Sequence, residues 1–347
     1  MNEASDFYQT HLDRVSRSFA FCIRQLPEPL HAWVGLSYLL CRIVDTIEDS
    51  TWPALDQQFS VFRAFDESLS SAEAARRLVG WSERFPDSLP ESERHLLNDA
   101  SRLLLDYHTL PPHVRDIIFQ LVLSMSQGMQ HFCRQRTDGS LRLGTLAEVN
   151  QYCFFVAGVV GELLANLVSK VEPRFLLSQG NLLRAHHFGL FLQKVNLLKD
   201  QVTDEKVGRH LIPSRELVED SSQANADGAL AFLLDVPKEQ LEFRRFCAWS
   251  LFLGLEALAV ARDSILRKRV LKVTRTEMQS IFDRVELALA DDHALSALFV
   301  SCTHKLGWPK AGSVARKALD FPEWLLKLYR GPLDAKSLAE LGVASSL

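Results

Sequence analysis

The chain has 347 residues, 47% of them hydrophobic and 24% charged, with 39 lysines and arginines against 43 aspartates and glutamates. This composition is typical of a soluble globular protein and excludes a disordered chain, a collagen-like fibre and a multi-span membrane protein. A formal net charge of −4 gives no general attraction to nucleic acid, so no nucleic-acid partner is expected. The 6 cysteines form no C-x-x-C pair, which disfavours a zinc site and predicts free thiols in a reducing compartment.

Apolar residues recur three and four positions apart along most of the chain, for example at Ile117, Ile118, Leu121, Val122 and Met125. This spacing predicts amphipathic helices. Proline and glycine are sparse, and we find neither a two-residue alternation nor an Asn-Gly hairpin turn. We therefore expect an all-α fold of roughly ten or more helices, built as a single domain over residues 1–347 around an apolar cavity. The polar, small-residue-rich segment 219–227 is predicted to be a loop between two helices.

The first predicted helix of interest runs from about Trp33 to Asp49 and has two unlike faces. At 100° per residue, its apolar stripe comprises Leu36, Leu39, Ile43 and Ile47. The opposite face comprises Tyr38, Arg42, Asp45 and Asp49, with Glu48 at its edge. This helix therefore presents two aspartates one turn apart on a polar face.

A second predicted helix, from about Asn181 to Asp204, repeats the arrangement. Its polar face comprises Gln193, Asn196, Asp200 and Asp204, and Phe191, Leu198 and Val202 fall on the other side. Carboxylates four residues apart are common on solvated surfaces, although like charges at this spacing repel. The alternative is a metal site, because Mg²⁺ takes oxygen ligands from one or two carboxylates together with substrate phosphates. The residues themselves leave both interpretations open.

Several sequence blocks, in a fixed order, resemble the squalene/phytoene synthase family. They are Ser16-Arg17-Ser18-Phe19-Ala20, the stretch from Tyr38 to Asp49, the stretch from Tyr152 to Gly161, the stretch from Gln193 to Glu205, and Gly208-Arg209 with Pro213. The resemblance is strongest over residues 7–282. It implies an all-helical isoprenoid-synthase fold and a head-to-head condensation of two prenyl diphosphates.

The resemblance also implies a role for individual residues. The implied metal ligands are Asp45, Glu48, Asp49, Asp200 and Asp204, with Mg²⁺ as the metal and Mn²⁺ as an alternative. The implied substrate-binding residues are Ser16, Arg17, Phe19, Tyr38, Arg42, Gln193, Asn196, Lys199 and Arg209. Tyr152 is implied to lie near the reacting carbons, where with the four aspartates it is expected to be catalytic. Gly158 and Gly161 are expected to permit close helix packing near the prenyl tails.

Within the family, the stretch from Phe188 to Asn196 is similar to the squalene branch. This implies that two farnesyl diphosphates form presqualene diphosphate, which NADPH then reduces to squalene. Lys272 and Arg275 lie in a basic block that resembles the segment expected to bind the NADPH phosphate, and no G-x-G-x-x-G loop is present. His210-Leu211-Ile212-Pro213 departs from the branch pattern, so a phytoene or dehydrosqualene synthase without the reductive step remains the alternative. An inactive scaffold protein is a third reading, which both surviving acid pairs disfavour.

The ends of the chain suggest where it works. The polar start has no signal-peptide pattern, and prolines and charges in the last forty residues disfavour a membrane anchor there. We therefore expect a bacterial-type, cytoplasmic and monomeric enzyme, supplying a sterol or hopanoid precursor. Peripheral contact with a membrane is left open, because the product is a hydrocarbon.

Overall fold

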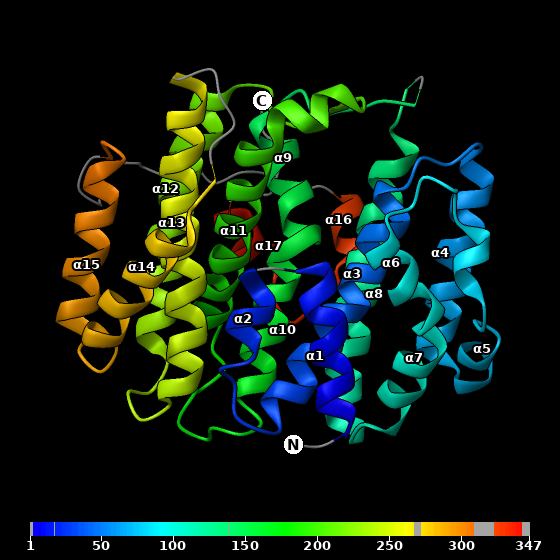
Figure 1. Ribbon diagram of the computed structural model, residues 1–347, viewed down its shortest axis with the longest axis horizontal. Helices are drawn as coiled ribbons and strands as arrows, with labels where there is room; N and C mark the ends of the chain where they lie inside the picture. The colour runs from blue at the N-terminus through cyan, green and yellow to red at the C-terminus, as the bar shows by residue number, and fades with distance from the viewer. Residues whose placement is uncertain (1–2, 17, 138, 267–271, 309–322, 342–347) are drawn as a thin grey trace.

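The computed structural model describes residues 3–16, 18–137, 139–266, 272–308 and 323–341. Almost every element in these ranges is helical, which confirms the all-α prediction (Figure 1). The first half comprises α1 (Glu3–Val15), α2 (Ser18–Ile23), α3 (Leu30–Asp49), α4 (Leu55–Ser70), α5 (Ala72–Arg76), the 3₁₀ turn η1 (Trp81–Arg84), α6 (Glu91–Asn98), α7 (Ala100–Thr109) and α8 (Pro112–Arg134). The second half comprises α9 (Leu146–Cys153), the π-helical turn η2 (Phe154–Gly158), α10 (Val159–Val168), α11 (Gln179–Lys206), α12 (Arg215–Asp235), α13 (Leu241–Leu266), α14 (Arg275–Ala288), α15 (Asp292–Lys305), α16 (Glu323–Leu328) and α17 (Ala335–Glu340).

The helices that carry the acidic motifs pass through the middle of the bundle (Figure 1). α3 packs on α1 and α8, and α11 packs on η2, α10, α12 and α13. α4 to α7 cover the side next to α3 and α8, while α13 to α15 form the opposite side. The two motif-bearing helices are thus both central, each with an outer layer of helices beyond it.

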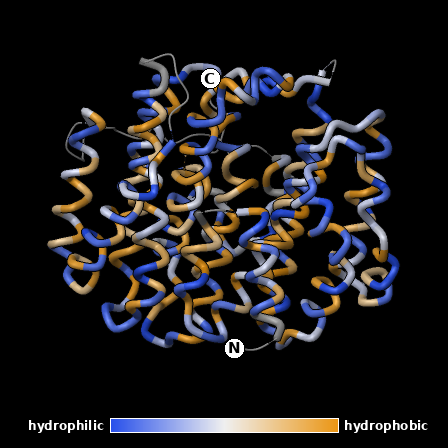
Figure 2. Tube along the Cα trace, in the orientation of Figure 1, coloured by the Kyte–Doolittle hydropathy of each residue, from blue (hydrophilic) through white to orange (hydrophobic). Residues whose placement is uncertain are grey.

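The apolar stripe of α3 is buried as predicted, because Leu36, Leu39, Ile43 and Ile47 are all 0% exposed. Orange apolar and blue polar segments alternate along most of the helices in Figure 2, as expected of amphipathic helices. Among the described residues, α3 and the segment Leu146–Val168 are long and apolar enough to cross a membrane. Most of both lies buried against other helices, as in the core of a globular bundle.

The glycines of the central motif permit a very close helix crossing. A Cβ atom at Gly161 would collide with the carbonyl of Ala185, and one at Gly189 would collide with the carbonyl of Ala157. α10 and α11 therefore meet backbone to backbone, which agrees with the packing role predicted for Gly161 and leaves no space between them at this point.

The predicted loop at 219–227 is wrong, because these residues lie inside the continuous helix α12. Their small side chains serve close packing instead of a turn. A Cβ atom at Gly228 would meet the ring of His187 on α11, and Asn225 and Ser222 are buried in the same interface. Small polar residues within a helix interface can thus be mistaken for a loop when the sequence alone is read.

Candidate active site

The acidic faces of α3 and α11 border the same cavity, which has a volume of about 260 Å³. Its walls comprise Arg42, Asp45, Glu48, Asp49, Tyr152, Val156, Gln193, Asn196, Leu197, Lys199, Asp200, Asp204 and Arg209. Two stretches about 150 residues apart in the chain are therefore brought together, as the metal-site interpretation requires. The four aspartates, Tyr152, Arg42, Gln193, Asn196, Lys199 and Arg209 all reach this cavity.

Arg42 and Asp45 form the part of the wall nearest the middle of α3. A guanidinium nitrogen of Arg42 lies 3.8 Å from a carboxylate oxygen of Asp45, and other nitrogens donate to Glu93 Oε1 at 2.6 and 3.1 Å. Glu93 comes from α6 and also accepts a hydrogen bond from Thr46 at 2.8 Å. Burial raises the pKa of Asp45 to about 6, which Arg42 opposes and the charge of Glu48 reinforces.

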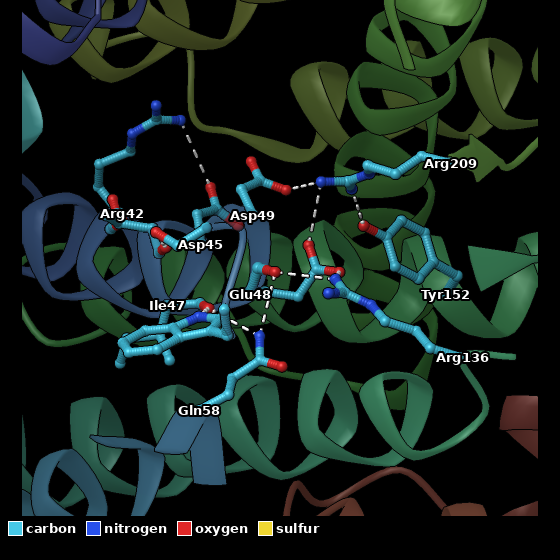
Figure 3. A network of polar contacts seen from close by, with 12 residues as sticks. Arg42, Asp45, Ile47, Glu48, Asp49, Gln58, Arg136, Tyr152 and Arg209 are labelled. Carbon is cyan, nitrogen blue, oxygen red and sulfur yellow. Dashed lines mark hydrogen bonds and ion pairs between the residues drawn. The ribbon is translucent and has the colours of Figure 1, made fainter. Parts of the chain in front are cut away.

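The C-terminal end of α3 leaves carbonyl groups that need partners from outside the helix. Trp52 and Gln58 donate to the carbonyl of Ile47, each at 2.8 Å, and Arg136 donates to the carbonyl of Glu48 at 2.8 Å. Arg136 also donates to the Glu48 carboxylate at 2.7 Å (Figure 3). Its positive charge is favourable at a helix C-terminus, so Arg136 holds both this end of α3 and the Glu48 side chain in place.

Arg209 is the second arginine that contacts the Glu48 carboxylate. The turn before it uses Gly208 in the left-handed region at φ 78°, and β2 (Arg209–His210) pairs in parallel with β1 (Leu141–Arg142). This fixed backbone places one Arg209 nitrogen 3.3 Å from Glu48 Oε2 and in an ion pair with Asp49 (Figure 3). Another nitrogen donates to the hydroxyl of Tyr152 at 2.8 Å.

Tyr152 stands where α9 gives way to the π-helical turn η2. A π-helical turn inserts an extra residue into the helix and is frequent at functional sites. The tyrosine is buried, and burial, followed by the charges of Glu48 and Asp45, raises its pKa well above the ordinary value. Tyr152 therefore presents a neutral hydroxyl to the cavity, with Arg209 as its donor.

The second acid pair lies near the C-terminal end of α11. Lys199 Nζ is 3.2 Å from Asp200 and 3.4 Å from Asn196 Oδ1. Burial raises the pKa of Asp204 to about 6, and the negative charges of Asp200 and Glu48 add to the increase. The Glu48 carboxylate on α3 thus acts across the cavity on Asp204 of α11.

The carboxylates of the cavity wall could hold a divalent cation only together with a bound molecule that supplies further oxygen atoms. Among the described residues, no group of three or more His, Cys, Asp or Glu side chains is close enough to hold a metal ion alone. Mg²⁺ commonly binds one or two carboxylates and completes its shell with water and substrate phosphates. Each acid pair offers such carboxylates, so the donor set suits an ion that arrives together with a diphosphate.

Several predicted site residues lie away from the cavity wall. Phe19 packs against Tyr38 of α3 with ring centroids 5.9 Å apart, the Ser16 side chain hydrogen-bonds to Tyr38, and none of the three lines the cavity. Arg17 lies outside the described residues. Lys272 and Arg275 are exposed near the start of α14 and do not line the cavity. The structure therefore gives no geometric support for an NADPH contact by these two residues at this wall.

The structure adds Arg136 and Glu93, which the sequence patterns did not single out. Both come from segments without a recognisable motif, and each contacts a motif residue from a distance of more than forty positions along the chain. A cation or anion at such a position is indistinguishable from a surface charge until the fold is known. The only sequence clue is that Glu48 and Arg42 are ionisable residues on a mostly apolar helix. A charged side chain buried there needs a partner from elsewhere in the chain.

These observations define a class of protein: an all-helical bundle in which two acidic helix faces and three basic side chains border one cavity. The squalene/phytoene synthase family model matches residues 12–265, and the chain belongs to this family. The match agrees with the resemblance noted over residues 7–282.

Individual relatives are squalene synthases. The chain is 34% identical over 208 residues to squalene synthase from Schizosaccharomyces pombe, covering 58% of this chain and 42% of that protein. It is 30% identical over 203 residues to squalene synthase from Bos taurus, covering 58% and 45%. The chain thus spans less than half the length of these curated relatives. They are eukaryotic, so they lend no support to the expectation of a bacterial type.

Solved structures share the fold. TcSQS in complex with the ligand E5700 has a TM-score of 0.67 and 24% sequence identity, covering 90% of this chain and 94% of that chain. A dehydrosqualene synthase in complex with a ligand has a TM-score of 0.50 and 18% identity, covering 83% and 96%. At these identities, the likeness supports the helical architecture alone.

Proposed function

We propose that the protein is a squalene synthase, which condenses two molecules of farnesyl diphosphate head to head through presqualene diphosphate and reduces the product to squalene. The observation that carries the proposal is the single cavity bordered by Asp45 and Asp49 on α3 and by Asp200 and Asp204 on α11. Membership of the family and the squalene synthase relatives support the same conclusion.

The cations around the cavity suit the diphosphate of an allylic substrate. Arg42 and Arg209 offer planar guanidinium groups, which match phosphate oxygens in two-point contacts. Lys199 adds a point charge beside Asp200. We infer that the oxygens of a diphosphate entering here take the place of the carboxylates that Arg209 contacts, since one guanidinium cannot bind both fully.

The acid pairs would hold Mg²⁺, with Mn²⁺ as a substitute. When bound, the metal neutralises the diphosphate leaving group and so eases its departure from the allylic carbon. Of the proposed ligands, Glu48 is the one whose carboxylate already contacts two arginines, Arg136 and Arg209. The other four carboxylates, Asp45, Asp49, Asp200 and Asp204, are therefore the stronger assignments.

Tyr152, with the apolar residues Val156 and Leu197 of the same wall, would face the carbocation that ionisation produces. A neutral hydroxyl dipole beside Val156 and Leu197 can orient a cation without offering it a strong nucleophile. The double bond of the second molecule then attacks the allylic carbon of the first. Loss of a proton closes the cyclopropane of presqualene diphosphate.

The reductive step rests on the squalene synthase relatives, with NADPH as the hydride donor. Lys272 and Arg275 remain a proposal for its phosphate, at a surface separate from the cavity wall. A phytoene or dehydrosqualene synthase is the alternative outcome. The single domain over residues 1–347, the monomeric state, the cytoplasmic location and the contact with a membrane remain predictions.

The proposal is tested by incubating the protein with farnesyl diphosphate and Mg²⁺, with and without NADPH, and identifying the hexane-soluble and diphosphate products. Presqualene diphosphate without NADPH and squalene with it are the expected results. Dehydrosqualene regardless of NADPH would support the alternative. No metal-dependent consumption of farnesyl diphosphate or a longer prenyl diphosphate would contradict both.

A further inference from the structure

The described C-terminal segment, residues 323–341, crosses the back of the bundle and is called here the strap. Its helix α16 packs on α8 and its helix α17 packs on α11, and both lie behind the central helices in Figure 1. Leu325, Leu333 and Leu338 are buried. The strap is therefore part of the core, although it lies beyond the residues that the family model matches.

A buried polar cluster anchors the strap in the bundle. The hydroxyl of Tyr329 donates to Glu162 on α10, and His186 on α11 lies 2.8 Å from the same carboxylate. Glu162 and His186 are at most 1% exposed, so this carboxylate depends on partners from the protein. A Cβ atom at Gly331 would collide with both Tyr329 and Glu162, which shows how closely the strap covers the cluster.

Two aromatic residues of the strap contact the two phenylalanines that begin the π-helical turn η2. The ring centroids of Tyr329 and Phe154 are 5.2 Å apart, and those of Trp324 and Phe155 are 5.8 Å apart. Phe155 is wedged on its other side against Gly128 of α8, where a Cβ atom would overlap the ring. The unusual turn is thus enclosed between α8 and the strap.

A second line of contacts leads from the strap to the reactive end of the site. Trp324 stacks on His131 with centroids 3.9 Å apart and meets Phe132 edge-on at 6.0 Å. Phe132 in turn meets Tyr152 edge-on at 5.3 Å. Tyr152 accepts the hydrogen bond from Arg209, so only one ring separates Trp324 from a residue of the cavity wall.

We propose that the strap fixes the π-helical turn from behind, and that Trp324 is a positioning residue for Tyr152. A π-helical turn is rare in proteins, and an uncommon backbone conformation persists where the surrounding structure holds it. Without Trp324, both Phe132 and Phe155 lose a flat partner, so the ring that packs on Tyr152 and the turn that follows Tyr152 in the chain both gain room to move. The consequence for turnover rests on the proposed function, whereas the consequence for the turn itself does not.

The test compares the wild-type protein with Trp324→Ala, Trp324→Phe and, as a matched control on the exposed face of the strap, Lys336→Ala. Amide hydrogen exchange at residues 154–158 is followed in the free protein. Steady-state kinetics with farnesyl diphosphate are measured in parallel. Trp324→Ala is expected to raise exchange in η2 by roughly tenfold or more while distant α4 is unchanged. The same variant is expected to lower kcat roughly 10- to 100-fold, with KM changing less than about twofold.

Trp324→Phe keeps a flat ring, so its amide exchange in η2 and its kcat are expected to lie close to the wild-type values. Lys336→Ala should match the wild type in both measurements. A folded Trp324→Ala variant with wild-type exchange in η2 and wild-type kcat would overturn the proposal. If Trp324→Ala does not fold, Trp324→Leu, which refills much of the volume without a flat ring, is held to the same expectation. If the wild type forms no prenyl product, the proposed function fails, and the exchange experiment still decides the role of the strap.

Discussion

Arg136, just beyond α8, donates to both the backbone carbonyl and the side-chain carboxylate of Glu48, at 2.8 and 2.7 Å. This pair joins the end of α3 to the loop that leads into β1, and β1 pairs with the strand that carries Arg209. The position of Arg209 over the first acid pair therefore depends on contacts well outside the recognisable motifs.

Replacing Arg136 with glutamine should impair both stability and turnover. The buried Glu48 carboxylate would lose one of its two charged partners and keep Arg209, so we expect a loss smaller than the cost of about 3–5 kcal/mol that follows when a buried charge is left unpaired. Urea denaturation and steady-state kinetics measure the two effects. Arg134→Gln, an exposed change at the last residue of α8, is the control and should alter stability by less than about 1 kcal/mol. Equal behaviour of the two variants would contradict the role assigned to Arg136.

The ligand-free protein should lose stability as pH rises through the range of the raised carboxylates. Asp45 and Asp204 have pKa values of about 6 in the folded protein, against about 3.9 for an unfolded aspartate. Between these values the folded state binds more protons, so the free energy of unfolding falls with increasing pH.

Thermal unfolding in EDTA between pH 4 and pH 7 measures this dependence. Asp45→Asn and Asp204→Asn should each flatten it and should raise Tm at pH 7 relative to the wild type. The same substitutions should lower turnover by orders of magnitude, because each removes one of the proposed metal ligands. An unchanged pH dependence in both variants would show that these carboxylates are not the groups responsible.

The sequence predicted the two acidic faces and most residues of the cavity wall, because a helix has a fixed period and the motifs lie within single helices. It could not predict Arg136, which meets Glu48 only through the tertiary fold. It also misread the segment 219–227, whose small polar residues are typical of loops but here form the contact between α12 and α11. Val202, placed on the apolar face of its helix, is 58% exposed. Amphipathic periodicity does not reveal that the last turns of α11 lack a neighbour on that side.

Lys194 is expected to make stability rise at alkaline pH. Its side chain is 0% exposed and donates to Ser221 at 2.6 Å and to Asn225 on α12. Burial lowers its pKa to about 8, whereas an unfolded lysine titrates near 10.4. Above about pH 8 the folded state releases this proton while the unfolded state keeps it, so folding is favoured as pH increases.

Lys194→Met removes the titration at nearly constant volume. The Tm of the wild type minus the Tm of the variant should therefore increase from pH 7 to pH 9.5. Lys199→Met, at the partly exposed wall of the cavity, is the control and should show no such trend. A constant difference between wild type and Lys194→Met would contradict the prediction.

Gly161→Ala should destabilise the fold, since its Cβ atom would collide with the Ala185 carbonyl and force α10 away from α11. Overpacking of this kind typically costs about 1–3 kcal/mol. Gly180→Ala in the first turn of α11 is the control, because its nearest neighbours are the flexible end of Arg184 at 3.4 Å and beyond. It should be neutral or slightly stabilising in urea denaturation. Comparable losses in both variants would argue against the close crossing.

The arrangement of the two acid pairs is tested most directly by a crystal structure with Mn²⁺ and farnesyl thiodiphosphate, an analogue that ionises very slowly. Anomalous scattering locates the manganese ions independently of the protein coordinates. We predict manganese peaks in contact with carboxylates of both α3 and α11, joined through the diphosphate oxygens. Manganese bound to only one helix, or a diphosphate bound elsewhere, would contradict the account.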